Sequence, residues 1–271
     1  MSEIELDSLM KIFQKRAKIL DNFRIISGYY KLILRDEEIA QTAKPGQFVM
    51  LKVAEGYQPL LRRPFSIHSV KTSRIEILYE IVGKGTEILS FKKAGEYLDV
   101  LGALGNGFSM LDSRYSILVG GGIGVAPLLY LAQRLTERTA QNAQHKALVL
   151  IGAKTKKEIL SKKEFANLGL DVKISTDDGS AGFKGKVTEL LKKILSTMDY
   201  RLSTIYACGP EPMLKEITEI ARIHKIPAQI SLEEYMACGL GVCLGCMVKT
   251  KGGYQAVCKV GPVFDSMVIK W

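Results

Sequence analysis

Long apolar runs are missing from this chain of 271 residues. A helix that spans a bilayer needs about 20 mostly apolar residues, and no segment here reaches about 18. Residues 1–20 are charged throughout and lack the apolar stretch of a signal peptide. We therefore expect no membrane association. A cytoplasmic location is expected because cysteine ligands without an export signal favour a reducing compartment.

Histidine is scarce as well, and His68, His145 and His224 are its three occurrences. None stands in a pattern with a nucleophile and an acid, so the sequence predicts no catalytic triad and no acid–base catalyst. We expect each histidine to be structural or to lie on the surface.

A concentrated basic tract is also absent, although the formal net charge is +10. The lysines occur as scattered pairs and are not interleaved with aromatic residues, which argues against nucleic-acid binding. We predict a solvated, lysine-rich surface whose modest positive bias favours an anionic cofactor or an acidic protein partner.

The most distinctive feature that is present is a group of four cysteines near the carboxyl end. Cys238, Cys243, Cys246 and Cys258 follow the spacing Cys-x4-Cys-x2-Cys-x11-Cys. Four thiolates at this spacing fit the ligand pattern of a plant-type [2Fe–2S] cluster. The glycines between them allow the backbone to curl closely around such a group.

Other uses of the four cysteines are less favoured. A structural zinc site usually repeats the Cys-x2-Cys pair or includes histidine, and residues 226–271 contain no histidine. A disulfide framework is typical of short secreted chains. The spacing therefore indicates the cluster before zinc or free thiols.

Residues 16–111 have the pattern of a small antiparallel barrel. Short segments rich in β-branched and aromatic residues are separated by glycine and proline, and the strands are expected at 23–34, 47–53, 64–70, 74–82 and 95–100. Residues 2–14 place apolar side chains at helical spacing and predict a short amphipathic helix without a chemical role.

Two segments of this predicted barrel have a composition suited to a ligand. In Arg63-Pro64-Phe65-Ser66 a guanidinium, a ring and a hydroxyl are available for a phosphate, a flat ligand and a polar edge, although an ordinary strand has the same pattern. Gly83-Lys84-Gly85-Thr86 is a glycine turn before a helix at residues 87–93, where free N–H groups attract anions. Thr86 is equally suited to cap that helix. Together the segments suggest a cofactor with a pyrophosphate.

From residue 115 the sequence alternates strands with helices, which predicts a doubly wound parallel sheet. Its strands are expected at 116–119, 147–151, 171–175 and 204–207, and its helices at 128–137 and 212–224. The glycines of residues 120–124 join the first strand to the first helix, as in a dinucleotide-binding turn, although proline stands where that motif has its third glycine.

The strand ends leave the choice of dinucleotide open. Lys154, Lys156 and Lys157 follow the second strand, where an NAD-binding motif has an acid. The ribose contact therefore comes from elsewhere, or the cofactor carries a 2′-phosphate. Residues 176–180 form an acidic tip that suits a ribose or a plain turn. Cys208 ends the fourth strand and either lies near a nicotinamide or is a buried small side chain.

Beyond a last strand at 229–232, the cysteines precede a hairpin expected from 247–249 and 254–257. A region of about 40 residues is too small to hold a core alone, so it must lean on the rest of the chain or on a partner. The domains predicted are an extension at 1–15, a barrel at 16–111, a dinucleotide domain at 112–228 and a cluster domain at 229–271.

The order of residues 63–66, 102–108, 120–127 and 208–210 resembles that of the ferredoxin–NADP reductase superfamily. The cysteine spacing, followed by Val-Gly-Pro-Val-Phe at 260–264, is similar to one branch, the electron-transfer subunits of NAD-linked dihydroorotate dehydrogenases. The similarity spans residues 16–264.

This resemblance implies FAD on the barrel, NAD on the parallel sheet and the [2Fe–2S] cluster at the four cysteines. The residues implied for FAD are Arg63, Pro64, Phe65, Ser66, Leu78, Tyr79, Glu80, Gly85 and Thr86. Those implied for NAD are Gly121, Gly122, Gly124, Cys208 and Gly209.

The resemblance also implies a partner, a catalytic subunit with FMN that oxidises dihydroorotate for pyrimidine biosynthesis, in a heterotetramer of two subunits of each kind. Alternatives are a reductase subunit of the same build that serves a hydrogenase or a ferredoxin:NADP complex, and a zinc-bearing adaptor without enzymatic activity.

Overall fold

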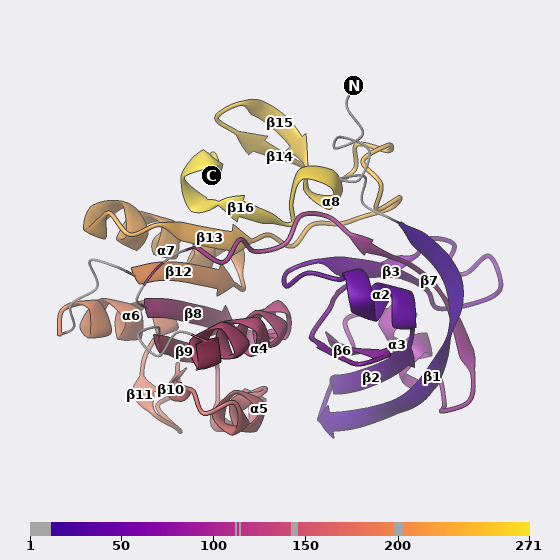
Figure 1. Ribbon diagram of the computed structural model, residues 1–271, viewed down its shortest axis with the longest axis horizontal. Helices are drawn as coiled ribbons and strands as arrows, with labels where there is room; N and C mark the ends of the chain where they lie inside the picture. The colour runs from indigo at the N-terminus through magenta and orange to yellow at the C-terminus, as the bar shows by residue number, and fades with distance from the viewer. Residues whose placement is uncertain (1–11, 112, 114, 142–145, 198–202) are drawn as a thin grey trace.

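The computed structural model describes residues 12–111, 113, 115–141, 146–197 and 203–271. An antiparallel barrel lies beside a parallel sheet with helices, and the carboxyl-terminal elements run across the top of both (Figure 1). Among these residues, no helix combines the length and the apolar composition needed to cross a bilayer.

The barrel is a seven-stranded antiparallel sheet with the order β4-β3-β7-β1-β2-β6-β5. Its strands are β1 (Phe13–Ile26), β2 (Tyr29–Arg35), β3 (Phe48–Lys52), β4 (Arg63–Ser66), β5 (Ser69–Lys71), β6 (Arg74–Glu80) and β7 (Tyr97–Leu104). Two short helices, α2 (Glu37–Thr42) and α3 (Lys84–Ser90), lie between strands. The inward side chains, among them Ile19, Leu32 and Ile77, are fully buried in one core.

Three expectations for this region need correction. Residues 64–70 fall in two strands, β4 and β5, instead of one, because the N–H of Ile67 donates to Gln47 before β3 whereas that of His68 donates to Glu76 of β6. Residues 23–34 form parts of two strands instead of one, because Gly28 adopts φ +81° and turns the chain between β1 and β2. The helix expected at residues 2–14 falls mostly outside the described residues, but Phe13 and Gln14 belong to β1 and pair with β7. The barrel therefore includes residues before position 16.

The second sheet has the order β11-β10-β9-β8-β12-β13-β16 and is parallel up to β13. Its strands are β8 (Tyr115–Gly121), β9 (Lys146–Ala153), β10 (Asp171–Thr176), β11 (Phe183–Lys184), β12 (Ser203–Cys208), β13 (Ala228–Ser231) and β16 (Val263–Asp265). The helices are η1 (Gly122–Val125), α4 (Ala126–Gln141), η2 (Lys156–Glu158), α5 (Lys162–Asn167), α6 (Val187–Leu195) and α7 (Glu211–His224).

Helices cover both faces of this sheet, as predicted. Helices α4 and α5 bury their apolar side chains in one core, and α6 and α7 bury theirs in another. The strand order reverses between β8 and β12, and ligands of such sheets bind beyond the carboxyl ends of the strands at this reversal.

The carboxyl-terminal region adds the predicted hairpin of β14 (Met247–Thr250) and β15 (Gly253–Ala256), followed by α8 (Val257–Val260) and η3 (Ser266–Val268). Cys246 and Cys258 are buried in the core that α6 and α7 share. Asn106, just after β7, pairs with Pro262 and donates from its side chain to the carbonyl of Val260 at 2.9 Å. The region therefore leans on both larger units, as its small size requires.

We propose the domain division at residues 16, 112 and 229 as a working description. The first boundary lies within β1 and the last lies within β13, and β16 from the final segment pairs with β13. The cluster region thus shares a sheet with the dinucleotide-binding unit.

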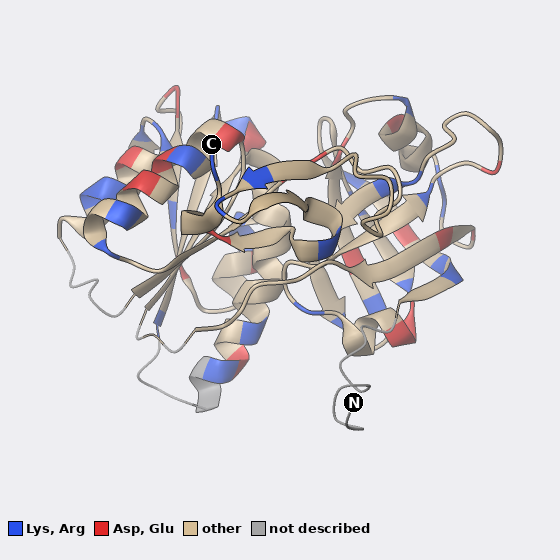
Figure 2. Ribbon diagram, turned by 90° about the horizontal axis from the view of Figure 1, so that it is seen from above, with Lys and Arg blue, Asp and Glu red and all other residues tan. Residues whose placement is uncertain are grey.

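Charged residues of both signs are interspersed over both units (Figure 2). In this view, the lysine and arginine positions of the described residues form no continuous stripe along the ribbon. This arrangement resembles the solvated surface that the sequence predicts.

Candidate functional site

The four cysteines lie on the loop between β13 and β14 and at the start of α8. Cys238 and Cys243 are close neighbours, and Cys246 and Cys258 form a second pair in which the N–H of Cys258 donates to Cys246 Sγ at 3.4 Å. None of the four forms a disulfide. Cys246 and Cys258 are buried, whereas Cys243 is exposed, so one pair faces the protein core and the other faces the surface.

Backbone N–H groups point at the sulfur atoms. The N–H of Gly241 donates to Cys258 Sγ at 3.0 Å, and that of Leu240 donates to Cys238 Sγ at 3.3 Å. Gly241 needs its glycine, because it adopts φ +77° and a Cβ there would lie 2.8 Å from Lys259 Cδ. Such N–H donors stabilise negative charge on sulfur.

The pKa values of Cys238 and Cys258 are shifted in opposite directions. Burial disfavours ionisation of Cys238, but the backbone N–H groups around it outweigh burial and lower its pKa to about 6. Burial, together with the neighbouring Cys246, raises the pKa of Cys258 to about 12. A cation that binds here must displace the proton from the buried thiol.

The arrangement of the four cysteines in two pairs distinguishes between a zinc ion and an iron–sulfur cluster. Within the described part of the chain, no three or more histidine, cysteine or acidic side chains gather closely enough to hold one metal ion. A structural zinc ion needs four ligands in one tetrahedron. Two pairs of thiols suit a cluster with two irons, where each iron takes two thiolates.

On the barrel, the two segments singled out from the sequence lie against each other. The Arg63 side chain packs on the first turn of α3, which begins at Lys84 instead of residue 87, with its Nε 2.8 Å from the point where a Cβ of Gly85 would stand. Arg63 Nη1 donates to the carbonyl of Leu61 at 2.7 Å, and no acid pairs with Arg63 among the described residues. A guanidinium whose printed partners are backbone carbonyls therefore stands beside a helix N-terminus, and both attract phosphate.

Thr86 has the capping role that the sequence left open. Its hydroxyl accepts from the N–H of Val82 at 3.0 Å and donates to the carbonyl of Gly83 at 3.0 Å. The side chain of Thr86 therefore shapes the turn, and its backbone remains the group that faces an anion.

The residues predicted on β6 alternate between two environments. Leu78 belongs to the core shared with α4, and Glu80 is half-buried on the same face of the strand. Tyr79 points into the barrel, where it stacks on Tyr30 with the ring centroids 5.7 Å apart. Burial raises the pKa of its hydroxyl, which donates to Asn22 at 3.0 Å. Tyr79 therefore contributes to the core with its ring, and only its backbone faces outward.

Asn22 has a role that the sequence analysis did not anticipate. Its side-chain amide donates to the carbonyls of Leu89 and Lys92, at 2.8 and 2.9 Å, at the far end of α3. With Tyr79 on its oxygen, Asn22 fixes α3 against the barrel. A single asparagine within a strand forms no periodic pattern, so the sequence alone could not identify these hydrogen bonds.

The residues predicted for a nicotinamide dinucleotide meet at the strand reversal. Gly120 on β8 lies beside Cys208 on β12, and the turn that contains Gly121 and Gly122 follows directly. A Cβ on Gly124 would lie 2.3 Å from the carbonyl oxygen of Cys208, so only glycine allows this approach. Backbone groups of η1 and β12 therefore lie together beyond the carboxyl ends of β8 and β12, where sheets of this kind bind a dinucleotide in a crevice.

Cys208 itself is 1% exposed. Burial raises the pKa of its thiol, with a further contribution from the charge of Glu233, so the thiol is neutral at ordinary pH. Its side chain is thus a small buried group, while its backbone and Gly209 form the wall of the crevice.

The ends of β9 and β10 are held together. Ser180 Oγ accepts from the N–H of Lys156 at 2.7 Å, and Asp178 accepts from the N–H of Ser180 at 2.9 Å. The hydroxyl of Ser180 also donates to Asp178, at 2.6 Å, and this bond, together with that from the N–H of Ser180, lowers the pKa of Asp178. Asp178 therefore builds the turn, which leaves the carboxylate of Asp177 exposed at the tip.

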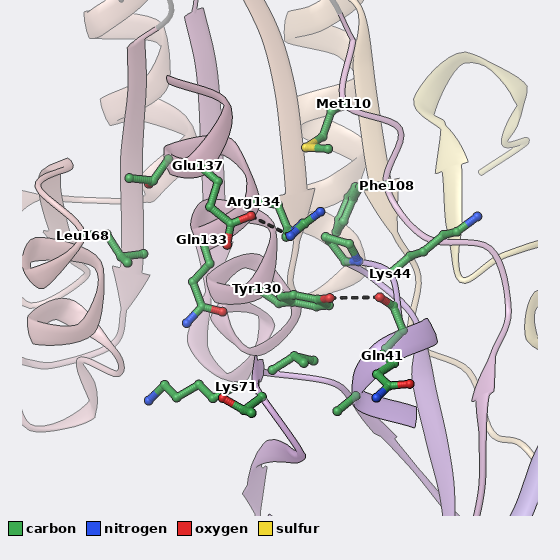
Figure 3. A pocket seen from close by; sticks show the side chains of 16 residues that line it. Gln41, Lys44, Lys71, Phe108, Met110, Tyr130, Gln133, Arg134, Glu137 and Leu168 are labelled. Carbon is green, nitrogen blue, oxygen red and sulfur yellow. Dashed lines mark hydrogen bonds and ion pairs between the residues drawn. The ribbon is translucent and has the colours of Figure 1, made fainter. Parts of the chain in front are cut away.

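A cavity of about 940 Å³ lies elsewhere, between α4 and the barrel (Figure 3). Tyr130 and Arg134 of α4 line one side, and Gln41 and Lys44 line the other. Tyr130 donates to the carbonyl of Ala43 at 2.9 Å, and Arg134 pairs with Glu137 at 2.6 Å. None of the residues predicted for a cofactor lines this cavity, so its size does not mark the redox site.

Comparisons with known proteins agree with this geometry. The family model for the iron–sulfur cluster binding domain of dihydroorotate dehydrogenase B matches residues 233–270, and that for an oxidoreductase NAD-binding domain matches residues 118–219. A solved structure of an NADH-dependent reduced ferredoxin-NADP oxidoreductase, studied for flavin-based electron bifurcation, superposes with a TM-score of 0.83 at 30% identity and covers 94% of this chain and 90% of its own.

A ferredoxin NADP⁺ reductase from Neisseria gonorrhoeae, solved with FAD and NADP, shares the fold with a TM-score of 0.66 at 19% identity, over 78% of this chain and 91% of its own. The fold and the site thus define an oxidoreductase of the ferredoxin–NADP reductase type with an added iron–sulfur domain.

The curated relatives narrow the class. The chain is 40% identical to the dihydroorotate dehydrogenase B (NAD(+)) electron transfer subunit of Desulforamulus reducens, over 97% of this chain and all of the relative. It is 39% identical to that of Caldanaerobacter subterraneus subsp. tengcongensis, over 93% of this chain and 96% of the relative. The chain belongs to this family of electron transfer subunits.

Proposed function

We propose that this chain carries electrons from a catalytic partner subunit to NAD⁺ through a [2Fe–2S] cluster at its four cysteines and FAD on its barrel. A bound flavin exchanges single electrons with a cluster and hydride with a nicotinamide, which is why it belongs between them. The chain supplies binding and orientation, and no acid–base catalyst is needed from it.

One observation carries the proposal. The loop with the cysteines packs directly on the barrel strand next to Arg63: a Cβ on Gly239 would lie 2.6 Å from Met50 Cγ. Met50 pairs with Pro64 across β3 and β4. The cysteine loop therefore contacts β3, the strand that pairs directly with the proposed flavin strand β4.

Each group has residues suited to it. Arg63 and the N–H groups at Gly85 and Thr86 would hold the pyrophosphate of FAD. Phe65 and Ser66 would contact the flavin, with the backbone of residues 78–80 beside them. Residues 121–124 and 208–209 would hold the nicotinamide dinucleotide at the carboxyl ends of β8 and β12, where glycine lets the two backbone segments approach closely.

The cysteine loop also offers a docking surface for the partner. Leu240, Val242 and Leu244 are 41%, 78% and 63% exposed, although all are large and apolar. Exposed apolar side chains around a redox group are typical of a protein interface. We propose that the partner is an FMN-containing subunit that oxidises dihydroorotate to orotate, in a heterotetramer of two subunits of each kind.

A second candidate rests on the solved structure at 30% identity, which is a reduced ferredoxin-NADP oxidoreductase. A reductase subunit of the same build would serve a ferredoxin:NADP complex or a hydrogenase. The partner that co-purifies with the chain distinguishes the two candidates.

The test is anaerobic purification, with iron, zinc and flavin measured for each chain. NADH should bleach the flavin absorption and then produce the electron paramagnetic resonance signal of a reduced [2Fe–2S] cluster. Dihydroorotate should do the same once the partner is present. A colourless, zinc-containing protein after reconstitution would instead identify an adaptor.

A further inference from the structure

A partly buried group of polar and charged side chains, in which Glu164 is 31% exposed, joins the barrel to the unit of the parallel sheet. Glu164 on α5 forms an ion pair with Lys31 on β2, and its second oxygen lies 3.5 Å from Nε2 of His68. Lys31 is 8% exposed and His68 is fully buried. Charges withdrawn from water in this way stay in place only when each finds a partner, so the geometry of the contact is narrowly defined.

The surrounding groups complete the pairing. Glu76, on β6, lies 3.7 Å from Lys31 Nζ and 3.0 Å from Lys71 Nζ. Nδ1 of His68 is 2.8 Å from the carbonyl oxygen of Ala126, the first residue of α4. The barrel therefore holds two separate elements of the other unit, α5 through its carboxylate and α4 through its first carbonyl.

These contacts lie close to both proposed cofactor sites. His68 is two residues beyond Ser66 of the flavin strand, and Ala126 is two residues beyond Gly124 of the nicotinamide turn. Lys31 pairs across strands with Leu78, whose strand borders the flavin. Through these contacts, the flavin strands are joined to the nicotinamide turn by very few residues.

Helix α5 anchors Glu164 to the core of the parallel-sheet unit. Phe165, next to Glu164, is fully buried in the core beneath α4, together with Leu160. A shift of the α5 backbone at Glu164 would therefore displace Phe165 in that core, because close-packed interiors do not deform gradually.

We propose that Glu164 is a positioning residue: held by Lys31 and His68, it sets the separation between the nicotinamide crevice and the flavin strands. The inference rests on the proposed function, since it concerns hydride transfer between those two groups. Hydride transfer depends steeply on the distance between donor and acceptor, and a displacement of about 1 Å can reduce a rate about a hundredfold.

The test uses the holoprotein with Glu164→Gln, which keeps the shape and removes the charge. Stopped-flow reduction of the bound flavin by NADH is measured per bound flavin, with NADH deuterated at the transferred position as a second substrate. We expect the rate to fall about tenfold and the isotope effect to rise, with flavin content and the NADH dissociation constant unchanged. Glu219→Gln, which breaks an exposed ion pair on α7 of the same unit, is the matched control and should change neither rate.

Lys31→Met provides an independent variant. If both residues act through one contact, the double variant should lose no more rate than the more affected single variant. Flavin reduction at the wild-type rate in Glu164→Gln would overturn the positioning role and leave the proposed function intact. A loss of rate that vanishes on normalisation to bound flavin would overturn it too, because it would show a structural role only. A wild-type protein that takes up no flavin would overturn both.

Discussion

Arg63 and Gly85 are in contact, although 21 residues lie between them in the chain. The contact joins a guanidinium on β4 to the turn that opens α3. The adjacent Arg62 differs, because its guanidinium is paired with Asp99 at 2.8 Å. Of these two arginines, Arg63 is the one whose charge is available to a ligand.

The first prediction concerns this arginine. Arg63→Ala should weaken FAD binding about tenfold or more, because a hydrogen bond to a charged group contributes roughly 1.5–3 kcal/mol. Flavin content after dialysis and the FAD dissociation constant measure the effect. Arg74→Ala, which removes an exposed arginine from β6 of the same barrel, is the control and should retain flavin. Equal flavin binding in the two variants would contradict the role of Arg63.

A second prediction separates the cluster from the flavin. Cys243→Ser should abolish the cluster and leave FAD bound, because the thiols and Arg63 occupy different strands and loops. Iron content and the flavin absorption spectrum measure the two groups independently. Cys208→Ser changes the buried cysteine outside the cluster loop and should keep the iron. Simultaneous loss of iron and flavin from Cys243→Ser alone would argue that the sites are one.

Those features that depend on local chemistry could be predicted from the sequence. The spacing of the four cysteines, the glycines after β8 and the alternation of strands and helices each have a local cause, and the parallel sheet and the hairpin at 247–256 follow from them. FAD as the ligand of the barrel was inferred from the family resemblance, because the local patterns indicate only a cofactor with a pyrophosphate.

Features that depend on distant contacts could not be predicted. Asn22 and the pair of Lys31 with Glu164 join positions far apart in the chain, and periodicity carries no information about such contacts. The division of residues 23–34 was missed for another reason, because the β-branched residues on both sides of Gly28 outweighed a single glycine. Whether Tyr79 is buried depends on the register of β6, because a shift of one residue would turn its side chain to the opposite face of the sheet.

A third prediction concerns the choice of nicotinamide. We expect NADH to reduce the bound flavin faster than NADPH, because the exposed carboxylate of Asp177 would repel a 2′-phosphate and bond a ribose hydroxyl. Asp177→Asn should narrow the preference, measured as the ratio of kcat/KM for the two reductants. Asp171→Asn, at the other end of β10, is the control. Preference for NADPH in the wild type would show that the lysines after β9 decide instead.

A fourth prediction follows from the titration of Glu164. Burial alone would raise its pKa, but the hydrogen bonds and charges of His68 and Lys31 outweigh burial and lower the pKa well below the usual range. A carboxyl group with a lowered pKa in the folded state contributes stability at pH values above its unfolded pKa of about 4.3. That contribution is lost as the pH falls below this value towards the folded pKa.

Glu164→Gln should therefore reduce the free energy of unfolding by about 2–3 kcal/mol near neutral pH. The difference from the wild type should shrink from about pH 4 downward, where the wild type loses the same contribution by protonation. Urea unfolding of the holoprotein at about pH 7 and about pH 3.5 measures both differences. Glu219→Gln, whose ion pair with Arg222 is exposed, should differ little from the wild type at either pH. A difference for Glu164→Gln that stays constant across this range would mean that the carboxylate charge does not hold the two units together.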